Sequence, residues 1–139
     1  MQQIFLVGRI IVGAFYLFNA FNHFTRLSQM AGFAASKHVP VPEAAVFVSG
    51  VLLAIAGLSL LLGVYPRIGA AAAVLFLVPV SVMMHAFWND ADASARMMDM
   101  INFTKNFALV GSTLMFFAIP EPWPYSVHVP AIRHARVAS

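Results

Sequence analysis

The chain has 139 residues, of which 61% are hydrophobic and only 9% are charged, and its mean hydropathy is +0.84. About a quarter of the residues of a soluble domain are charged, so this composition excludes a water-soluble protein and predicts one domain in a lipid bilayer. The net charge of +3 includes no basic run, which excludes nucleic acid as a partner, and the absence of cysteine excludes disulfides, iron–sulfur clusters and covalently attached haem.

Four apolar segments are long enough to cross a hydrocarbon core of about 30 Å as helices of about 20 residues. They cover residues 4–24, 45–64, 68–87 and 100–119. Because backbone groups in lipid must be hydrogen-bonded within their own segment, the sequence predicts an all-α fold, a four-helix transmembrane bundle. The first segment has no basic leader or cleavage site, so we expect a retained helix.

The links between the segments differ in length and composition. Between the second and third segments, Gly63 and Pro66 leave room only for a tight turn, which predicts an antiparallel hairpin. The longer link TRLSQMAGFAASKHVPVPEA predicts a short interfacial helix that ends before Pro40 and Pro42. The links therefore predict four spans and one short helix between the first two.

The tail and the basic residues bear on orientation. The proline-rich tail, residues 120–139, is expected to be extended, with Trp123 and Tyr125 at the level of the lipid headgroups. The end of the bundle that holds both termini carries Arg67, Arg133 and Arg136, with Arg9 nearby. The opposite end carries Arg26, Lys37, Arg96 and Lys105. The counts are balanced, and we expect an integral protein of the bacterial cytoplasmic membrane with both termini cytoplasmic.

Polar residues within apolar helices are candidates for function, because lipid does not solvate them. Arg9, Tyr16 and His23 are seven residues apart, which places them on one face of the first helix. Residues from three helices are expected at one depth near the mouth of the bundle, opposite the termini: Asn19, His23, His85, Asn102, Lys105 and Asn106. With Trp88 as an aromatic lip, they predict a polar ligand pocket. The structural alternatives are interhelical hydrogen bonds for the histidines and asparagines, and a snorkelling side chain for Lys105.

Small residues on the second and third helices predict close helix packing. They are Gly50, Ala54 and Gly57, followed by residues 69–73. Their lack of bulk lets neighbouring backbones approach, so we interpret them as packing positions and not as a ligand site.

Several stretches taken together resemble the successive signatures of the DoxX family of small four-helix membrane proteins. They are GRIIVGAFYLFNAFNHF, MAGFAASKHVPVPEAAVFVSG, GLSLLLGVYPRIGAAAAVLFLVPVSVMMHAFW and FTKNFALVGSTLMF, in that order. The resemblance extends from residue 8 to residue 116, and the sequences from His85 to Trp88 and at Lys105 and Asn106 are its more specific parts.

The resemblance implies several functions. Members of the family are linked to thiosulfate oxidation with a quinone acceptor, to membrane oxidoreductase complexes and to pathways in which a partner performs the chemistry. Many relatives carry an acidic residue in the middle of the second helix, where this chain has Leu53. A mechanism that needs a buried carboxylate at that position therefore does not follow here.

Three interpretations remain at the level of sequence. The first is a redox-associated membrane subunit that binds a quinone, with His23, His85 or Lys105 donating hydrogen bonds to its oxygens. The second is a non-enzymatic scaffold that contacts a protein partner through its polar mouth and the acidic link from Asp90 to Asp99. The third, which we disfavour, is a haem b protein with His23 and His85 as axial ligands. No motif identifies catalytic residues or a metal site, so the chain is expected to depend on a cofactor or partner for any electron transfer.

Overall fold

The computed structural model describes residues 1–127, and within them the chain is all-α, as predicted. The helices are α1 (Gln2–Thr25), α2 (Leu27–Ser36), α3 (Pro42–Leu62), α4 (Pro66–Met84) and α5 (Ala93–Met115), with short 3-10 helices η1 (Phe87–Asn89) and η2 (Phe116–Ala118). The predicted short helix between the first two spans is α2. The predictions for residues 128–139, including Arg133 and Arg136, lie outside the described residues.

Among the described residues, three helical stretches are long and apolar enough to cross a membrane: Gln2–Thr25, Pro42–Leu62 and Pro66–Asn89. The fourth predicted span corresponds to α5, whose first half carries Asp99, Asn102 and Lys105 and is less apolar. This helix begins before the predicted residue 100, because Asp92 caps it by accepting a hydrogen bond from the backbone nitrogen of Ala95 at 2.8 Å. The hydropathy pattern therefore predicted the apolar part of α5 but not the polar turns before residue 100.

Close packing of α1 against α3 depends on two glycines. A Cβ atom built on Gly57 would lie 2.7 Å from Leu17 Cγ and 2.9 Å from the carbonyl oxygen of Gly13. A Cβ atom on Gly13 would in turn lie 2.9 Å from Leu61. The predicted role of Gly57 in packing is confirmed, because the two backbones approach too closely for any side chain there.

Replacing Gly57 with alanine is expected to force α1 and α3 apart and to lower the free energy of unfolding by roughly 1–3 kcal/mol, the usual cost of overpacking. Gly111→Ala is the matched control, since a Cβ atom there meets nothing within 4 Å. Alanine at that exposed helical position should be neutral or stabilise by up to about 1 kcal/mol. Thermal unfolding in detergent measures both, and equal melting temperatures for the two variants would contradict the packing argument.

The predicted hairpin between the second and third spans is confirmed. Gly63 ends α3 in the left-handed conformation, with φ at 69°, and Pro66 is at the beginning of α4. Ser59 Oγ lies 2.6 Å from the carbonyl oxygen of Val64 and 2.8 Å from that of Tyr65, so its hydroxyl can donate to the turn. Hydrogen bonds thus hold the short connection in place.

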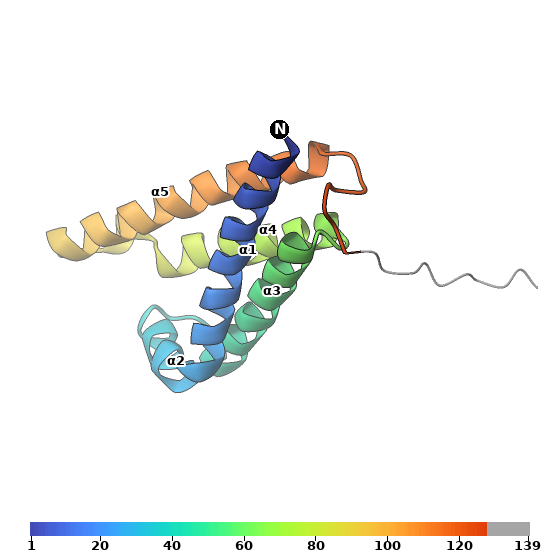
Figure 1. The fold of residues 1–139 in the computed structure, drawn as a ribbon. Helices are drawn as coiled ribbons and strands as arrows, with labels where there is room; N and C mark the ends of the chain where they lie inside the picture. Colours follow the sequence, from blue (N-terminus) through green and yellow to red (C-terminus); the bar gives the residue numbers. More distant parts are fainter. Residues whose placement is uncertain (128–139) are drawn as a thin grey trace, which may run out of the picture.

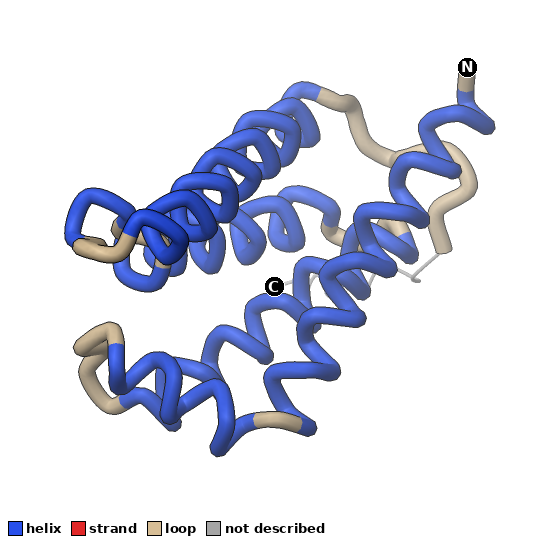
Figure 2. The backbone as a smooth tube through the Cα atoms, turned by 90° about the vertical axis from the view of Figure 1, so that its left-hand side faces the viewer, coloured by secondary structure: helices blue, strands red, loops and turns tan. Residues whose placement is uncertain are grey.

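The helices do not form a closed parallel bundle. Tyr16, just past the middle of α1, and Thr113, near the end of α5, are hydrogen-bonded at 3.3 Å. From there α1 and α3 diverge from α4 and α5, and α2 lies at the wide end, as Figures 1 and 2 show. The predicted polar pocket, formed by the first half of α5 and the last turns of α1, would have to bridge this separation.

At the opposite end, the segment 120–127 folds back onto the helices. Arg9 is buried on α1 and donates hydrogen bonds to the carbonyl oxygens of Pro124 and Tyr125, both at 3.0 Å. Trp123 is also buried and packs edge-to-face against Phe5, with ring centroids 5.0 Å apart. The segment is thus part of the folded core, with Trp123 inside protein and Tyr125 exposed.

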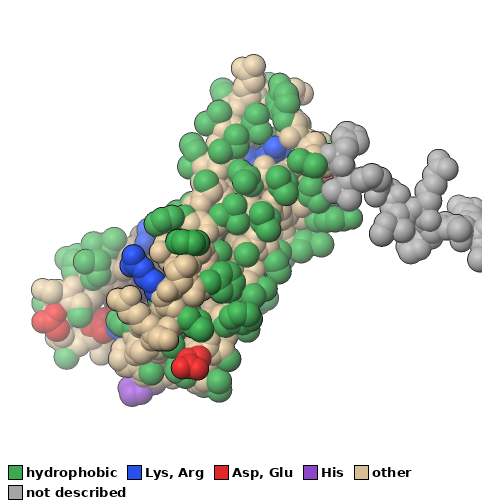
Figure 3. All heavy atoms as spheres, turned by 60° about the horizontal axis from the view of Figure 1, so that its bottom comes forward, with side chains coloured by type: hydrophobic (Ala, Val, Ile, Leu, Met, Phe, Trp, Pro, Cys, Tyr) green, Lys and Arg blue, Asp and Glu red, His purple; other side chains and the backbone are tan. Residues whose placement is uncertain are grey.

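The surface of the helices is apolar, as expected for a protein in lipid. In the view of Figure 3, hydrophobic side chains cover most of the visible helical surface, whereas most charged side chains gather at the end that includes α2. We call this end, which also includes the link before α5, the α2 end. It corresponds to the predicted mouth of the bundle.

Candidate functional site

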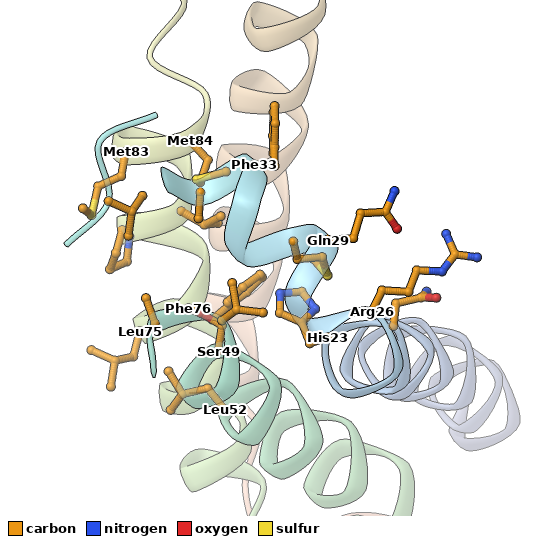
Figure 4. Close-up of a pocket in the computed structure, with 18 residues that line it drawn as sticks. His23, Arg26, Gln29, Phe33, Ser49, Leu52, Leu75, Phe76, Met83 and Met84 are labelled. Carbon is orange, nitrogen blue, oxygen red and sulfur yellow. The ribbon is translucent and has the colours of Figure 1, made fainter. Parts of the chain in front are cut away.

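A cavity of about 460 Å³ lies under α2 at the wide end of the helices. Segments of α1, α2, α3 and α4 form its walls (Figure 4). Its apolar lining includes Met30, Phe33, Val46, Leu52, Leu75, Phe76, Val80 and Met84. Its polar lining is small and consists of Asn22, His23, Arg26, Gln29 and Ser49. Because His23 is the buried polar residue among them, we call this space the His23 cavity.

His23 is positioned by its own helix. Its imidazole Nδ1 lies 2.8 Å from the backbone carbonyl oxygen of Asn19, one turn earlier on α1. Its ring packs edge-to-face with Phe76 of α4, with centroids 5.7 Å apart and planes at 80°. Only 8% of the residue is exposed. The imidazole is thus held by a backbone hydrogen bond on one side and an aromatic ring on the other.

The cavity opens toward the lipid-facing surface of α4. Leu75 and Met83 line it and yet are 62% and 40% exposed. In Figure 4 the side chains of Arg26 and Gln29 extend away from the ring of His23 and from the apolar lining residues. An apolar molecule could therefore enter from the acyl chains without crossing a charged rim.

A second polar group lies at the α2 end, where the link after α2 meets α5. Lys37 Nζ lies 2.6 Å from Asp99 Oδ2 and 3.1 Å from Asp90 Oδ1, and His85 Nδ1 lies 3.1 Å from Asp99 Oδ1. We call these four residues the Lys37 cluster. It connects the α1–α2–α3 side of the molecule to the α4–α5 side at their widest separation.

The charges of the Lys37 cluster stabilise one another. Burial raises the pKa of Asp99, but hydrogen bonds from Lys37 and His85 outweigh it and leave the pKa below its ordinary value. The hydrogen bond to Asp99 raises the pKa of Lys37, against a smaller opposing effect of burial. Lys37 and Asp99 are therefore both charged at neutral pH and form an ion pair.

The structure divides the predicted polar pocket among separate places. His23 lines the cavity, whereas His85 belongs to the Lys37 cluster. Lys105 is exposed on α5 and donates to Asn102 Oδ1 at 2.9 Å, as a snorkelling lysine would. Trp88 is 52% exposed and packs edge-to-face against Phe103, with centroids 5.6 Å apart. The physical reason is the divergence of α1 from α5, which leaves their polar turns on opposite sides of the wide end.

Two further candidates, Asn19 and Asn106, lie outside both the His23 cavity lining and the Lys37 cluster. Asn19 Nδ2 donates to the carbonyl oxygen of Phe15 at 2.8 Å, within its own helix. Asn106 is buried on the face of α5 that also holds Asp99 and Thr113. A ligand-binding role for these asparagines stays a prediction.

Sequence reasoning missed Lys37 and Asp99 as functional candidates. Both residues are among the charges expected near the mouth, but their pairing joins positions 62 residues apart in the chain. The sequence does contain an indication of this contact: a lysine follows the predicted short helix, and three aspartates lie between the third and fourth predicted spans. Pairing of opposite charges at one depth would have predicted the contact.

The histidine and carboxylate side chains are distributed over separate surroundings. Within residues 1–127 no three histidine, aspartate or glutamate side chains are grouped so as to hold a metal ion. The two histidines of the haem b hypothesis occupy different surroundings, His23 beside Phe76 and His85 beside Asp99. The geometry thus favours the His23 cavity as the candidate site for a small molecule.

Comparison with known proteins identifies a family. A family model described as DoxX matches residues 4–86, which include α1 from its third residue, all of α2, α3 and α4, and every residue that lines the His23 cavity. Neither the curated proteins nor the solved structures include a match to the chain.

Proposed function

The chain belongs to the DoxX family of membrane proteins, and on this premise we propose that it is a redox-associated membrane subunit that binds a quinone-like ring in the His23 cavity. The observation that carries the proposal is an apolar cavity with one buried imidazole. Small-molecule sites have this character: an apolar wall supplies affinity, and a few placed polar groups orient the ligand.

The size and lining of the cavity support a ring with an apolar tail. Its volume of about 460 Å³ is within the range of about 300–1,000 Å³ typical of ligand sites. Phe76 and His23 offer ring edges and faces for packing, and the exposed flank at Leu75 leaves a route for a tail into lipid. A quinone-like molecule matches both features.

We also propose that the chain from residue 100 to residue 119, which begins within α5, is the fourth transmembrane span and that both termini are cytoplasmic in a bacterial membrane. In support, the segment after η2 returns to the end where α1 begins and α3 meets α4: Val127 N donates to the carbonyl oxygen of Leu62 at 3.0 Å. An ion pair between Arg67 and Glu121 at 3.3 Å lies at the same end. Four spans would place these segments on one side of the bilayer.

The proposal assigns ligand binding to this chain and electron transfer to a protein partner in a membrane complex. The cavity lining supplies apolar surface and a protonatable imidazole, which are groups that hold a ligand and exchange a proton. Transfer of electrons to or from the ligand would come from the partner's cofactor.

Binding of a quinone analogue, with and without a side chain that blocks the cavity, tests the proposal. With decylubiquinone as the probe, saturating amounts at 100 to 1,000 times Kd should stabilise the wild-type protein by about 3–4 kcal/mol, seen as a higher melting temperature in detergent. Ser49→Leu places a larger side chain in the cavity and should abolish this shift, whereas Ser112→Leu on the exposed face of α5 should retain it.

The same assay separates the two histidines. His23→Leu should reduce, without abolishing, the shift given by the reduced form, decylubiquinol, and His85→Leu should retain the full shift because His85 contacts Asp99 and not the cavity. A wild-type protein with no shift from either decylubiquinone or its reduced form, decylubiquinol, would overturn the proposed function.

A further inference from the structure

We infer that the His23 cavity selects a ring that offers a hydroxyl donor, such as a hydroquinone or a phenol, over a ring whose oxygens can only accept hydrogen bonds. The inference rests on the proposed function, since it names the chemical class of the ligand in the same cavity. It reverses the donor role that the sequence suggested for His23.

The backbone contact of His23 fixes the tautomer of its neutral imidazole. A carbonyl oxygen can only accept, so the 2.8 Å contact with Asn19 O requires the proton on Nδ1. A neutral imidazole carries one N–H, and Nε2 is then a lone-pair acceptor. Because the partner is a backbone atom of the same helix, this assignment depends on the helix and not on the side chain of Asn19.

The acceptor atom is free to contact a ligand. Within residues 1–127, three side-chain atoms are fully buried and have no hydrogen-bond partner: Arg9 Nε, Asp90 Oδ2 and Trp123 Nε1. His23 Nε2 is not one of these fully buried atoms, and the His23 side chain lines the cavity. Figure 4 shows its ring directed toward Phe76 and the interior of the site. A hydroxyl placed there would donate to Nε2.

The other polar groups of the lining do not supply an equivalent buried donor. Arg26 and Gln29 are exposed and extend away from the ring of His23 in Figure 4. Asn22 Nδ2 already donates to the carbonyl oxygen of Phe18 at 3.1 Å, within its own helix. Ser49 is half-buried on α3 and has the only hydroxyl of the described lining, so it is the further donor to be tested. A carbonyl or ether oxygen facing Nε2 would bring two lone pairs together, which a buried site rejects.

Three probes that share one ring and one tail test the inference. They are decylubiquinol, decylubiquinone and the dimethyl ether of decylubiquinol, measured by titration without oxygen against the purified full chain. Decylubiquinol should bind with a Kd at least about tenfold below that of either other probe. His23→Leu should reduce this preference to less than about twofold, and Ser49→Ala should retain it.

Asn19→Ala is the matched control, because it removes the side chain and keeps the backbone carbonyl that holds Nδ1. It should retain the full preference. Equal binding of the three probes, or tighter binding of decylubiquinone, would overturn the inference and leave the proposed function standing. Absence of binding by all three would instead overturn the proposed function.

A measurement without ligand tests the tautomer directly. In the nitrogen NMR spectrum of the unliganded protein, the neutral ring of His23 should show a protonated Nδ1 and an unprotonated Nε2. His23→Leu assigns the signals. A proton found on Nε2 of the neutral ring would overturn the inference whatever the probes show.

Discussion

Replacement of Arg9 by methionine is expected to release the segment 120–127 from the end of the bundle and to lower the free energy of unfolding by roughly 2–4 kcal/mol. Arg9 is 2% exposed, and its two terminal nitrogens donate to the carbonyl oxygens of Pro124 and Tyr125. Hydrogen bonds from a charged donor contribute about 1.5–3 kcal/mol each, and their loss leaves two carbonyl groups without partners. Gly63 packs directly against the guanidinium, so the space fits arginine closely.

The fluorescence of Trp123 measures this release. The chain has two tryptophans, and Trp88→Phe leaves Trp123 alone as the reporter. In that background, Arg9→Met should shift the emission of the buried indole to longer wavelength and speed amide exchange at Val127, whose N–H donates to Leu62 O. Arg9→Lys should give an intermediate effect, because a single ammonium replaces two spaced donors. Unchanged emission and exchange in Arg9→Met would show that the segment is held by packing alone.

The sequence predicted those elements of the fold whose causes are local. Apolar length predicts the spans of α1, α3 and α4, and Gly63 with Pro66 predicts the hairpin because both residues favour one backbone geometry at a helix boundary. The seven-residue spacing of Arg9, Tyr16 and His23 correctly predicted one buried face of α1. These features depend on short stretches of chain.

The arrangement of the site depends on the angles between helices, which local patterns do not contain. The prediction that polar turns of α1 and α5 share one pocket assumed nearly parallel helices, whereas the helices diverge at the α2 end. The His23 cavity is lined by Met30 and Phe33 of α2, which the sequence predicted as a short interfacial helix without its position against α1, α3 and α4. A prediction of the cavity needed the position of this short helix as well as the polar residues.

The tail shows the same limit. Proline content predicted an extended segment with Trp123 at the headgroup level, but Trp123 is buried against Phe5. The buried guanidinium of Arg9 needs acceptors, and the backbone carbonyls of the tail provide them. The polar residue in the first helix and the returning tail explain each other, although each is unusual by itself.

The second large effect is expected at Lys37. Lys37→Met keeps much of the side chain's length and removes the charge that Asp90 and Asp99 share, so it should lower the free energy of unfolding at neutral pH by roughly 1–3 kcal/mol. This lies between the small contribution of an exposed ion pair and the larger cost of breaking a buried one, as suits a partly buried cluster. Lys105→Met is the matched control, since that exposed lysine donates a hydrogen bond to Asn102 Oδ1 at the surface, and it should change stability by less than about 0.5 kcal/mol.

The pH dependence of the Lys37→Met effect identifies its electrostatic origin. The pKa of Asp99 is lowered in the folded state, so its contribution is present above the ordinary carboxyl value near pH 4 and is lost as pH falls through the folded pKa. The pKa of Lys37 is raised, so its contribution is present below the ordinary value near pH 10 and is lost as pH rises through the folded pKa. The stability difference between wild type and Lys37→Met should therefore be present at about pH 8, where Asp99 and Lys37 are both charged, and should shrink below about pH 4. Chemical unfolding in detergent across this range measures the difference, and a gap of the same size at acid pH would mean that Lys37 acts through packing and not through its charge.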